Sequence, residues 1–166
     1  ALFARLVASA REQPQVFVHR DFHSCNLMLL PGGALGVIDF QDAVMGPITY
    51  DVVSLFRDAF ISWEEEQEID WVVRYWEKAR AAGLPVREDF GDFWRDYELM
   101  GLQRHLKVLG IFCRLKYRDG KEKYSEDLPR FMNYARKTAR RYVQLKPLLN
   151  LLDKLEGNTE QIGYRR

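Results

Sequence analysis

The sequence predicts a mainly helical α+β fold in which an opening helix and short strands precede a series of helices. Before Gly46 the chain alternates short apolar runs with polar turns, whereas beyond Pro47 apolar residues recur at spacings of three and four. The chain has 166 residues, 47% hydrophobic and 30% charged, which suits one compact unit with a sizeable core and excludes a disordered or collagen-like chain.

Membrane, secreted and zinc-knuckle proteins are disfavoured by the same sequence. Charged residues interrupt every apolar run, and no signal peptide is visible, so we expect no membrane association. Cys25 and Cys113 lie far apart and outside any C-x-x-C pair, which speaks against a disulfide framework or a zinc site. A reduced, cytoplasmic protein is the expectation.

The first two elements are a helix and a strand. Leu2, Phe3, Leu6 and Val7 share one helical face, so the chain is already helical at its first residue, which is Ala1 and not Met. A chain that begins inside a helix is expected to be part of a longer one. A β-branched and aromatic strand then covers residues 16–18.

A hairpin and a series of helices follow. The two hairpin strands, residues 27–30 and 35–40, are joined by a turn that reads P-G-G. The glycine of G-L-P at 83–85 stops one of the helices, and Pro147 ends or kinks another. The predicted helices cover residues 50–60, 64–82, 90–117 and 127–146, with a short turn to 155 and a polar tail over 157–166.

The polar stretch between the strands carries the chemistry. Residues 19–26 read H-R-D-F-H-S-C-N, the spacing H-R-D-x-x-x-x-N of a kinase catalytic loop, and the hairpin then leads to I-D-F at 38–40. Asp21 suits the carboxylate that orients an acceptor hydroxyl and takes its proton. The oxygens of Asn26 and Asp39 suit Mg²⁺, and the hairpin between them can bring both to one end of its strands.

Other interpretations of this loop explain less. A polar turn whose Asp and Asn cap backbone groups would leave two histidines unexplained. A hydrolase metal site at His19 and His23 would need a helix with glutamate after the first histidine, whereas the sequence here predicts a strand followed by Arg20. We therefore interpret both histidines as hydrogen-bonded scaffolding of the loop, and Cys25 as a packing residue.

The residues after the loop resemble a family of small-molecule kinases. Gln41 replaces the glycine that follows this Asp-Phe in protein kinases, and no activation segment separates it from G-P-I-T-Y-D at 46–51. The pattern resembles the aminoglycoside phosphotransferase and choline kinase-like family. The resemblance implies the C-terminal lobe of a protein-kinase-like fold, use of ATP and Mg²⁺, and structural support of the catalytic loop by Asp51.

Longer stretches resemble a narrower group within that family. Residues 17–58, 100–110, 117–121 and 127–130 are similar to the bacterial anomeric kinases for N-acetylmuramate and N-acetylglucosamine, which serve cell-wall recycling. The resemblance implies an amino sugar phosphorylated at its C1 hydroxyl. Candidate substrate contacts are Gln41, Asp42, Arg104 and His105, although a buried hydrogen-bonded pair explains the last two equally well.

One part of such kinases is missing from the sequence. Only 18 residues precede His19, none of them is glycine, and the first lysine is Lys78, so neither a glycine-rich phosphate loop nor the strand lysine is present. We expect residues 1–156 to form the C-terminal lobe without its nucleotide lobe, and to be inactive alone. The exposed lobe-facing surface should be apolar and could pair two chains.

Rival functions are weaker. Acidic residues prevail up to Gln103, and basic residues prevail from Arg104 to Lys146. The basic side of the predicted helix over 127–146 lies opposite an apolar stripe, which is typical of an ordinary solvated face. We therefore expect no nucleic-acid partner. An aminoglycoside-type antibiotic kinase binds a polycation and is therefore expected to have a more acidic substrate surface. A non-catalytic interaction module would not need Asp21, Asn26 and Asp39 together.

Overall fold

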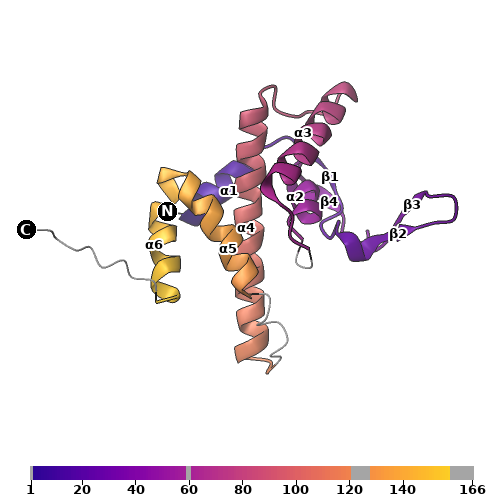
Figure 1. Ribbon diagram of the computed structural model, residues 1–166. Coiled ribbons are helices and arrows are strands. Elements are labelled where there is room, and N and C mark those ends of the chain that lie inside the picture. The colour runs from indigo at the N-terminus through magenta and orange to yellow at the C-terminus, as the bar shows by residue number, and fades with distance from the viewer. Residues whose placement is uncertain (1, 59–60, 121–127, 158–166) are drawn as a thin grey trace, which may run out of the picture. The chain divides into compact units, whose positions relative to one another are not determined.

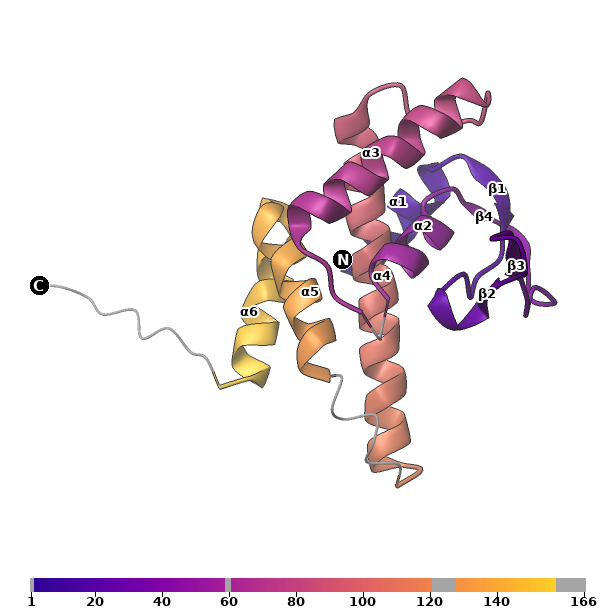
Figure 2. The same cartoon turned by 45° about the vertical axis from the view of Figure 1, so that its right-hand side comes forward.

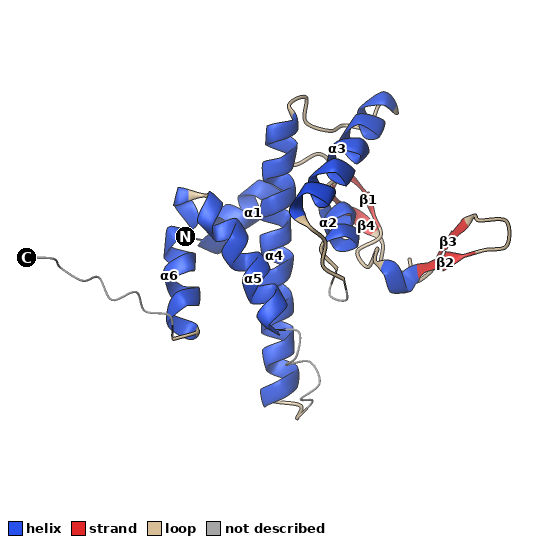
Figure 3. Ribbon diagram, in the orientation of Figure 1, coloured by secondary structure: helices blue, strands red, loops and turns tan. Residues whose placement is uncertain are grey.

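The fold was analysed in a computed structural model that describes residues 2–58, 61–120 and 128–157. The chain is mainly helical with two small antiparallel sheets, which confirms the α+β class (Figure 3). It divides into two compact units, one from Phe3 to Arg104 and one from His105 onward. Within the described ranges, no helix is long and apolar enough to cross a membrane.

The first unit contains the strands and most of the predicted helices. The opening helix, the first strand, the hairpin and the helix after residue 64 are confirmed, and the long helix has the predicted bounds. The elements are α1 (Leu2–Glu12), β1 (Gln15–Val18), the 3-10 turn η1 (Ser24–Asn26), β2 (Leu27–Leu29), β3 (Leu35–Val37), β4 (Val44–Pro47), α2 (Tyr50–Phe56), α3 (Glu65–Ala81) and α4 (Phe90–Tyr117), which continues into the second unit.

The predicted hairpin consists of β2 and β3. They pair antiparallel with Leu27 opposite Val37, and the connecting turn holds Gly32 and Gly33 at φ of +85° and +83°, which glycine adopts without strain. The hairpin extends away from the helices of its unit (Figure 1). Its second strand ends at Val37 and not at residue 40, because the chain turns there toward the catalytic loop.

The strand β4 was not predicted. It pairs antiparallel with β1, with Val18 opposite Val44. The pairing brings together the two ends of residues 19–43, which carry the predicted catalytic residues and are called the catalytic segment below. Its sequence, V-M-G-P, holds two residues that are rare in strands. Gly46 is required by packing, since a Cβ at that position would lie 2.6 Å from Val18 Cγ2.

The core of the first unit lies between α2, α3 and α4. Tyr97 and Phe93 of α4 are fully buried there, and the strands contribute little to it. The buried cluster comprises Ile48, Val52, Val53, Val72, Phe93, Tyr97 and Met100. The catalytic segment thus lies at the edge of a helical core, and α2 follows it in the sequence after β4.

Two predicted helix ends are wrong. The helix predicted over 50–60 ends at Phe56, because Arg57 leaves helical geometry (φ −115°, ψ 49°); residues 59–60 lie outside the described residues. The helix predicted over 127–146 ends at Arg141, whereas Pro147 lies in the first turn of the next helix. Proline is favoured in a first helical turn because that turn needs no amide donor.

The second unit is helical. After the end of α4 it contains α5 (Leu128–Arg141), the 3-10 turn η3 (Val143–Leu145) and α6 (Lys146–Leu155). The guanidinium of Arg136 on α5 pairs with Asp153 at 3.2 Å and Glu156 at 2.6 Å, which ties α5 to the end of α6. Asp127 and the predicted tail from residue 158 lie outside the described residues.

Candidate active site

The loop between β1 and β2 brings three predicted residues together. Asn26 donates from Nδ2 to the backbone oxygen of Asp21 at 2.9 Å and to Oδ2 of Asp39 at 3.4 Å. The hairpin accounts for this approach, because Ile38 donates its backbone N–H to the oxygen of Asn26 at 3.1 Å. The carboxylates of Asp21 and Asp39 belong to exposed residues, so both are open to ligands.

Two residues of this site have strained backbones. Arg20 has φ +79° and Asp39 has φ +68°, the only positive values at non-glycine positions in the described part of the chain. Such conformations cost about 1–2 kcal/mol each and persist only where the surroundings enforce them. One lies directly before Asp21 and the other at a predicted metal ligand, so the strain is confined to the site.

Asp51 holds the strained loop from the first turn of α2. Its carboxylate accepts the backbone N–H of His19 at 2.6 Å and that of Arg20 at 3.0 Å. Hydrogen bonds to a charged acceptor are stronger than neutral ones, which is how a strained backbone can be retained. Burial, and to a smaller extent the charge of Asp51, raises the pKa of Tyr75 above its ordinary value.

The histidines lie where scaffolding residues would lie. His19 is buried, and its Nε2 is 2.9 Å from the backbone oxygen of Ile38, which links the catalytic loop to the residue before Asp39. His23 is half-buried, and its backbone bonds both neighbours in the loop: its N–H donates to the oxygen of Asp21, and its oxygen accepts the N–H of Asn26.

Arg104 reaches the same loop from α4. It donates to the backbone oxygen of Arg20 at 3.3 Å and to Ser54 Oγ at 2.8 Å, and its guanidinium lies 4.5 Å from the ring centre of Tyr50. These contacts make Arg104 a positioning residue of the loop. His105 belongs to the second unit, where it is buried and its ring stacks on Tyr134 with centroids 4.8 Å apart.

The two candidates after the hairpin contact the site in different ways. Gln41 donates to Asp39 Oδ1 at 2.6 Å, so it orients the carboxylate that is predicted to bind metal. Asp42 contributes its backbone oxygen, which accepts from Arg20 at 3.3 Å, and it is exposed.

One contact of the loop was not anticipated from the sequence. Ser24 donates to Oδ2 of the buried Asp58 from its hydroxyl at 2.8 Å and from its backbone N–H at 3.4 Å. Asp58 lies just beyond the end of α2, so it fastens the second half of the loop while Asp51 fastens the first. The signal available in the sequence was an acidic residue at the end of an apolar helix.

Next to Asp58 lies a buried ion cluster of Arg57, Glu68 and Glu98. The guanidinium of Arg57 pairs with Glu68 at 2.5 Å and lies 3.8 Å from Glu98, and Tyr97 donates its hydroxyl to Glu68 at 2.8 Å. Burial lowers the pKa of Arg57, but the surrounding Tyr97, Glu68 and Glu98 outweigh it and hold that pKa above its ordinary value. The chain therefore leaves α2 at a buried guanidinium that is paired with two glutamates.

The donor set fits a magnesium ion that is also bound by phosphate. Asp39 carries carboxylate oxygens and Asn26 an amide oxygen, and Mg²⁺ characteristically takes one or two protein ligands beside substrate phosphates. Asn26 faces Asp39 Oδ2 with its Nδ2, so binding of an ion by both residues would require the amide to turn its oxygen toward Asp39. In the described residues, no three His, Cys, Asp or Glu side chains form a group able to hold a metal by themselves. Cys25 and Cys113 are free and exposed, so the interpretation of Cys25 as a packing residue is wrong.

This combination of catalytic loop, strained Asp-Phe turn and bracing aspartate defines a phosphotransferase class, and comparison with known proteins agrees. Residues 1–90 match the model of the phosphotransferase enzyme family, so the chain belongs to that family. It is 64% identical over 148 residues to the N-acetylmuramate/N-acetylglucosamine kinase of Neisseria meningitidis serogroup B, an alignment covering 89% of this chain and 44% of the relative.

Two further relatives carry the same name. The N-acetylmuramate/N-acetylglucosamine kinase of Pseudomonas aeruginosa is 51% identical over 93% of this chain and 46% of its own length. That of Pseudomonas putida is 48% identical over 92% of this chain and 44% of its own length. The chain thus spans somewhat less than half the length of the curated relatives it matches.

Proposed function

We propose that the protein containing this chain transfers the γ-phosphoryl group of ATP to the anomeric hydroxyl of N-acetylmuramate or N-acetylglucosamine. The observation that carries the proposal is the convergence of Asp21, Asn26 and Asp39 on one loop and hairpin, with backbone strain confined to that place. The names of the relatives support the choice of sugar.

In this proposal Asp21 is the catalytic base. Its exposed carboxylate accepts the proton of the acceptor hydroxyl as the new phosphoester bond forms and the bond to the leaving phosphate oxygen breaks. Asn26 and Asp39 would hold Mg²⁺, which neutralises charge on the phosphates when it is bound. Gln41 orients Asp39, while Asp51, His19, His23 and Arg104 fix the shape of the loop.

This chain would supply the C-terminal lobe, residues 1–156, of a two-lobed kinase. The relatives are more than twice as long as the matched region, which leaves room for a nucleotide-binding lobe. Such a reaction belongs in the cytoplasm, where ATP is available. We expect residues 1–166 to show little turnover alone.

The hairpin and the small sheet β1–β4 present an apolar surface on which the nucleotide-binding part would lie. Its most exposed side chains are Leu29 at 78%, Phe17 at 70% and Met45 at 67%. An apolar surface of this kind is characteristic of a covered interface. In the chain alone the same surface could pair two copies, which light scattering after size-exclusion chromatography would detect as a doubled mass.

The test uses the longest natural polypeptide that carries this sequence, beside residues 1–166. ADP release is followed with Mg-ATP and a panel of N-acetyl amino sugars, aminoglycosides and choline. We expect turnover with an N-acetyl amino sugar and a loss of about 10²- to 10⁴-fold in Asp21→Asn. Turnover of an aminoglycoside or choline instead would replace the sugar assignment, and an Asp21→Asn enzyme with normal kcat would remove the base from Asp21.

A further inference from the structure

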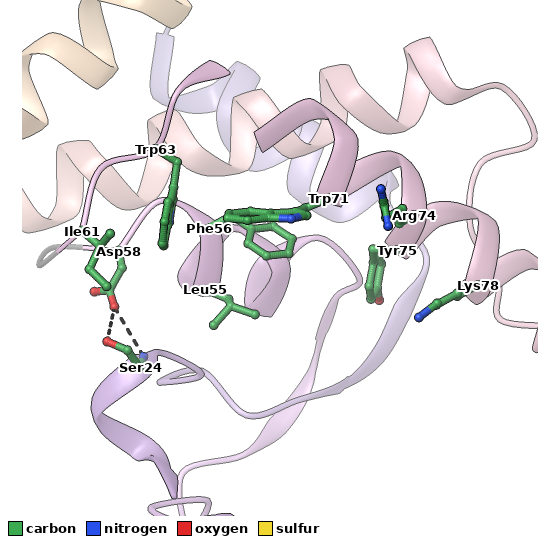
Figure 4. Close-up of a pocket in the computed structure, with 10 residues that line it drawn as sticks. All are labelled: Ser24, Leu55, Phe56, Asp58, Ile61, Trp63, Trp71, Arg74, Tyr75 and Lys78. Atoms are coloured by element: carbon green, nitrogen blue, oxygen red, sulfur yellow. Dashed lines mark hydrogen bonds between the residues drawn. The ribbon is translucent and has the colours of Figure 1, made fainter. Parts of the chain in front are cut away.

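A cavity of about 460 Å³ borders the catalytic loop in the first unit. We call it the aromatic pocket; the lining residues used below are Ser24, Asp58, Trp63, Trp71, Arg74 and Lys78 (Figure 4). Its volume falls within the range of about 300–1,000 Å³ that is usual for small-molecule sites. Another cavity, of about 480 Å³, is lined by residues of α1, β1, β4, α2 and α4 and includes none from the catalytic loop.

One end of the aromatic pocket is formed by the catalytic loop itself. Ser24 lies three residues after Asp21, and its double hydrogen bond to Asp58 fixes it in the pocket wall. The carboxylate of Asp58 is thereby engaged with the loop. A molecule in the pocket consequently has one end against the segment that carries the proposed base.

The middle of the pocket is aromatic. Trp63 and Trp71 meet edge to face, with centroids 4.9 Å apart and planes at 82°, and Phe56 lies 5.5 Å from Trp71. Trp63 remains 38% exposed, so an indole surface is open to a ligand. Aromatic walls with a few polar groups are the usual lining of small-molecule sites, and the C–H face of a pyranose is an apolar surface that such rings can cover.

The end opposite Ser24 and Asp58 is basic (Figure 4). Arg74 and Lys78 lie one turn apart on α3. Arg74 forms an exposed pair with Asp70 at 2.8 Å, whereas Lys78 makes no ion pair with any described residue. An ammonium group beside an aromatic wall is suited to a ligand that carries a carboxylate.

We infer that the aromatic pocket is the acceptor-sugar site, that the pyranose packs against Trp63 and Trp71, and that Lys78 binds the carboxylate of N-acetylmuramate. N-acetylglucosamine lacks the lactyl carboxylate of N-acetylmuramate, so Lys78 sets the preference between the two sugars. The inference rests on the proposed function and adds to it a binding site and a specificity residue.

The test measures binding and not turnover. Both sugars are titrated calorimetrically, without nucleotide, into the longest natural polypeptide carrying this sequence and into its Lys78→Gln variant. Lys154→Gln is the matched control, because Lys154 is also an exposed lysine in the last turn of a helix but lies in α6. Trp63→Ala tests the aromatic wall at a partly exposed position, and circular dichroism checks that each variant is folded.

We expect Lys78→Gln to weaken N-acetylmuramate binding relative to N-acetylglucosamine, changing the ratio of the two Kd values roughly five- to tenfold. Lys154→Gln should leave this ratio at its original value. Trp63→Ala should weaken both sugars roughly fivefold or more, since both present the same pyranose face.

An unchanged ratio in Lys78→Gln would overturn the assignment of Lys78, and unchanged binding of both sugars in Trp63→Ala would overturn the site. If either result came from a polypeptide that still phosphorylates an amino sugar, the proposed function would stand while the site was rejected. A polypeptide that neither binds nor phosphorylates these sugars would reject both.

Discussion

The catalytic loop and the buried ion cluster are two charged regions of the same unit that are stabilised in opposite ways. In the cluster, Arg57, Glu68 and Glu98 are nearly inaccessible, and the guanidinium lies next to both carboxylates. In the loop, the carboxylates of Asp21 and Asp39 are exposed, and the backbone around them is strained. Charge in the cluster is thus enclosed within the fold, whereas charge in the loop is open to solvent, as the proposed substrate and metal binding would require.

The largest effect on stability should come from the cluster. Arg57→Met would leave two glutamates buried without their cation, which typically costs about 3–5 kcal/mol. Urea unfolding followed by circular dichroism measures this loss. Asp21→Asn is the matched change in the loop, and we expect the free energy of unfolding to move by less than about 0.5 kcal/mol. Equal losses in the two variants would contradict the distinction between the regions.

Asp51 supports the catalytic loop from α2 and should affect both stability and catalysis. Asp51→Asn removes the charge that accepts the amides of His19 and Arg20, so the free energy of unfolding should fall by about 1–2 kcal/mol. In the longer polypeptide kcat should fall about tenfold or more, with a smaller change in KM, because loop geometry is lost while the sugar site remains. A change confined to KM would show that Asp51 does not position the loop.

Arg104 should have a smaller effect. Arg104→Lys keeps the positive charge but cannot reach both the oxygen of Arg20 and the hydroxyl of Ser54, which should cost about 1 kcal/mol. Arg95→Lys on the same helix is the control, since Arg95 pairs only with exposed Asp92 at 3.2 Å. Chemical denaturation distinguishes them, and an equal response would remove Arg104 from the support of the loop.

The smallest effect should come from the exposed pair of Arg74 and Asp70, whose side chains are 68% and 51% accessible. Asp70→Asn should change the free energy of unfolding by no more than about 0.5 kcal/mol, because solvent screens the pair. A loss comparable to that of Arg57→Met would show that burial is not what separates strong from weak ion pairs in this chain.

The features that depend on the spacing of nearby residues could be predicted from the sequence. The spacing H-R-D-x-x-x-x-N and the later I-D-F located the loop and predicted that Asn26 and Asp39 lie close together, which the structure confirms. Helical periodicity gave the bounds of α4. The strand β4 was missed because glycine and proline obscure it; Gly46 is there to accommodate Val18, a residue far away in sequence. The break after Arg141 was missed because Pro147 was interpreted as a helix end, although proline also begins helices.

The sequence by itself determined the family of this protein, and it predicted which carboxylates and which amide act in catalysis. Only the tertiary structure decided which distant residues hold them, since Asp58 and Arg104 meet the loop through folding and not through any spacing along the chain. Asp21 and Asn26 lie on one loop, and Asp39 follows a short hairpin, so these three residues leave a local pattern. Supporting and substrate-binding groups need only be close in space, and their contacts are fixed by packing.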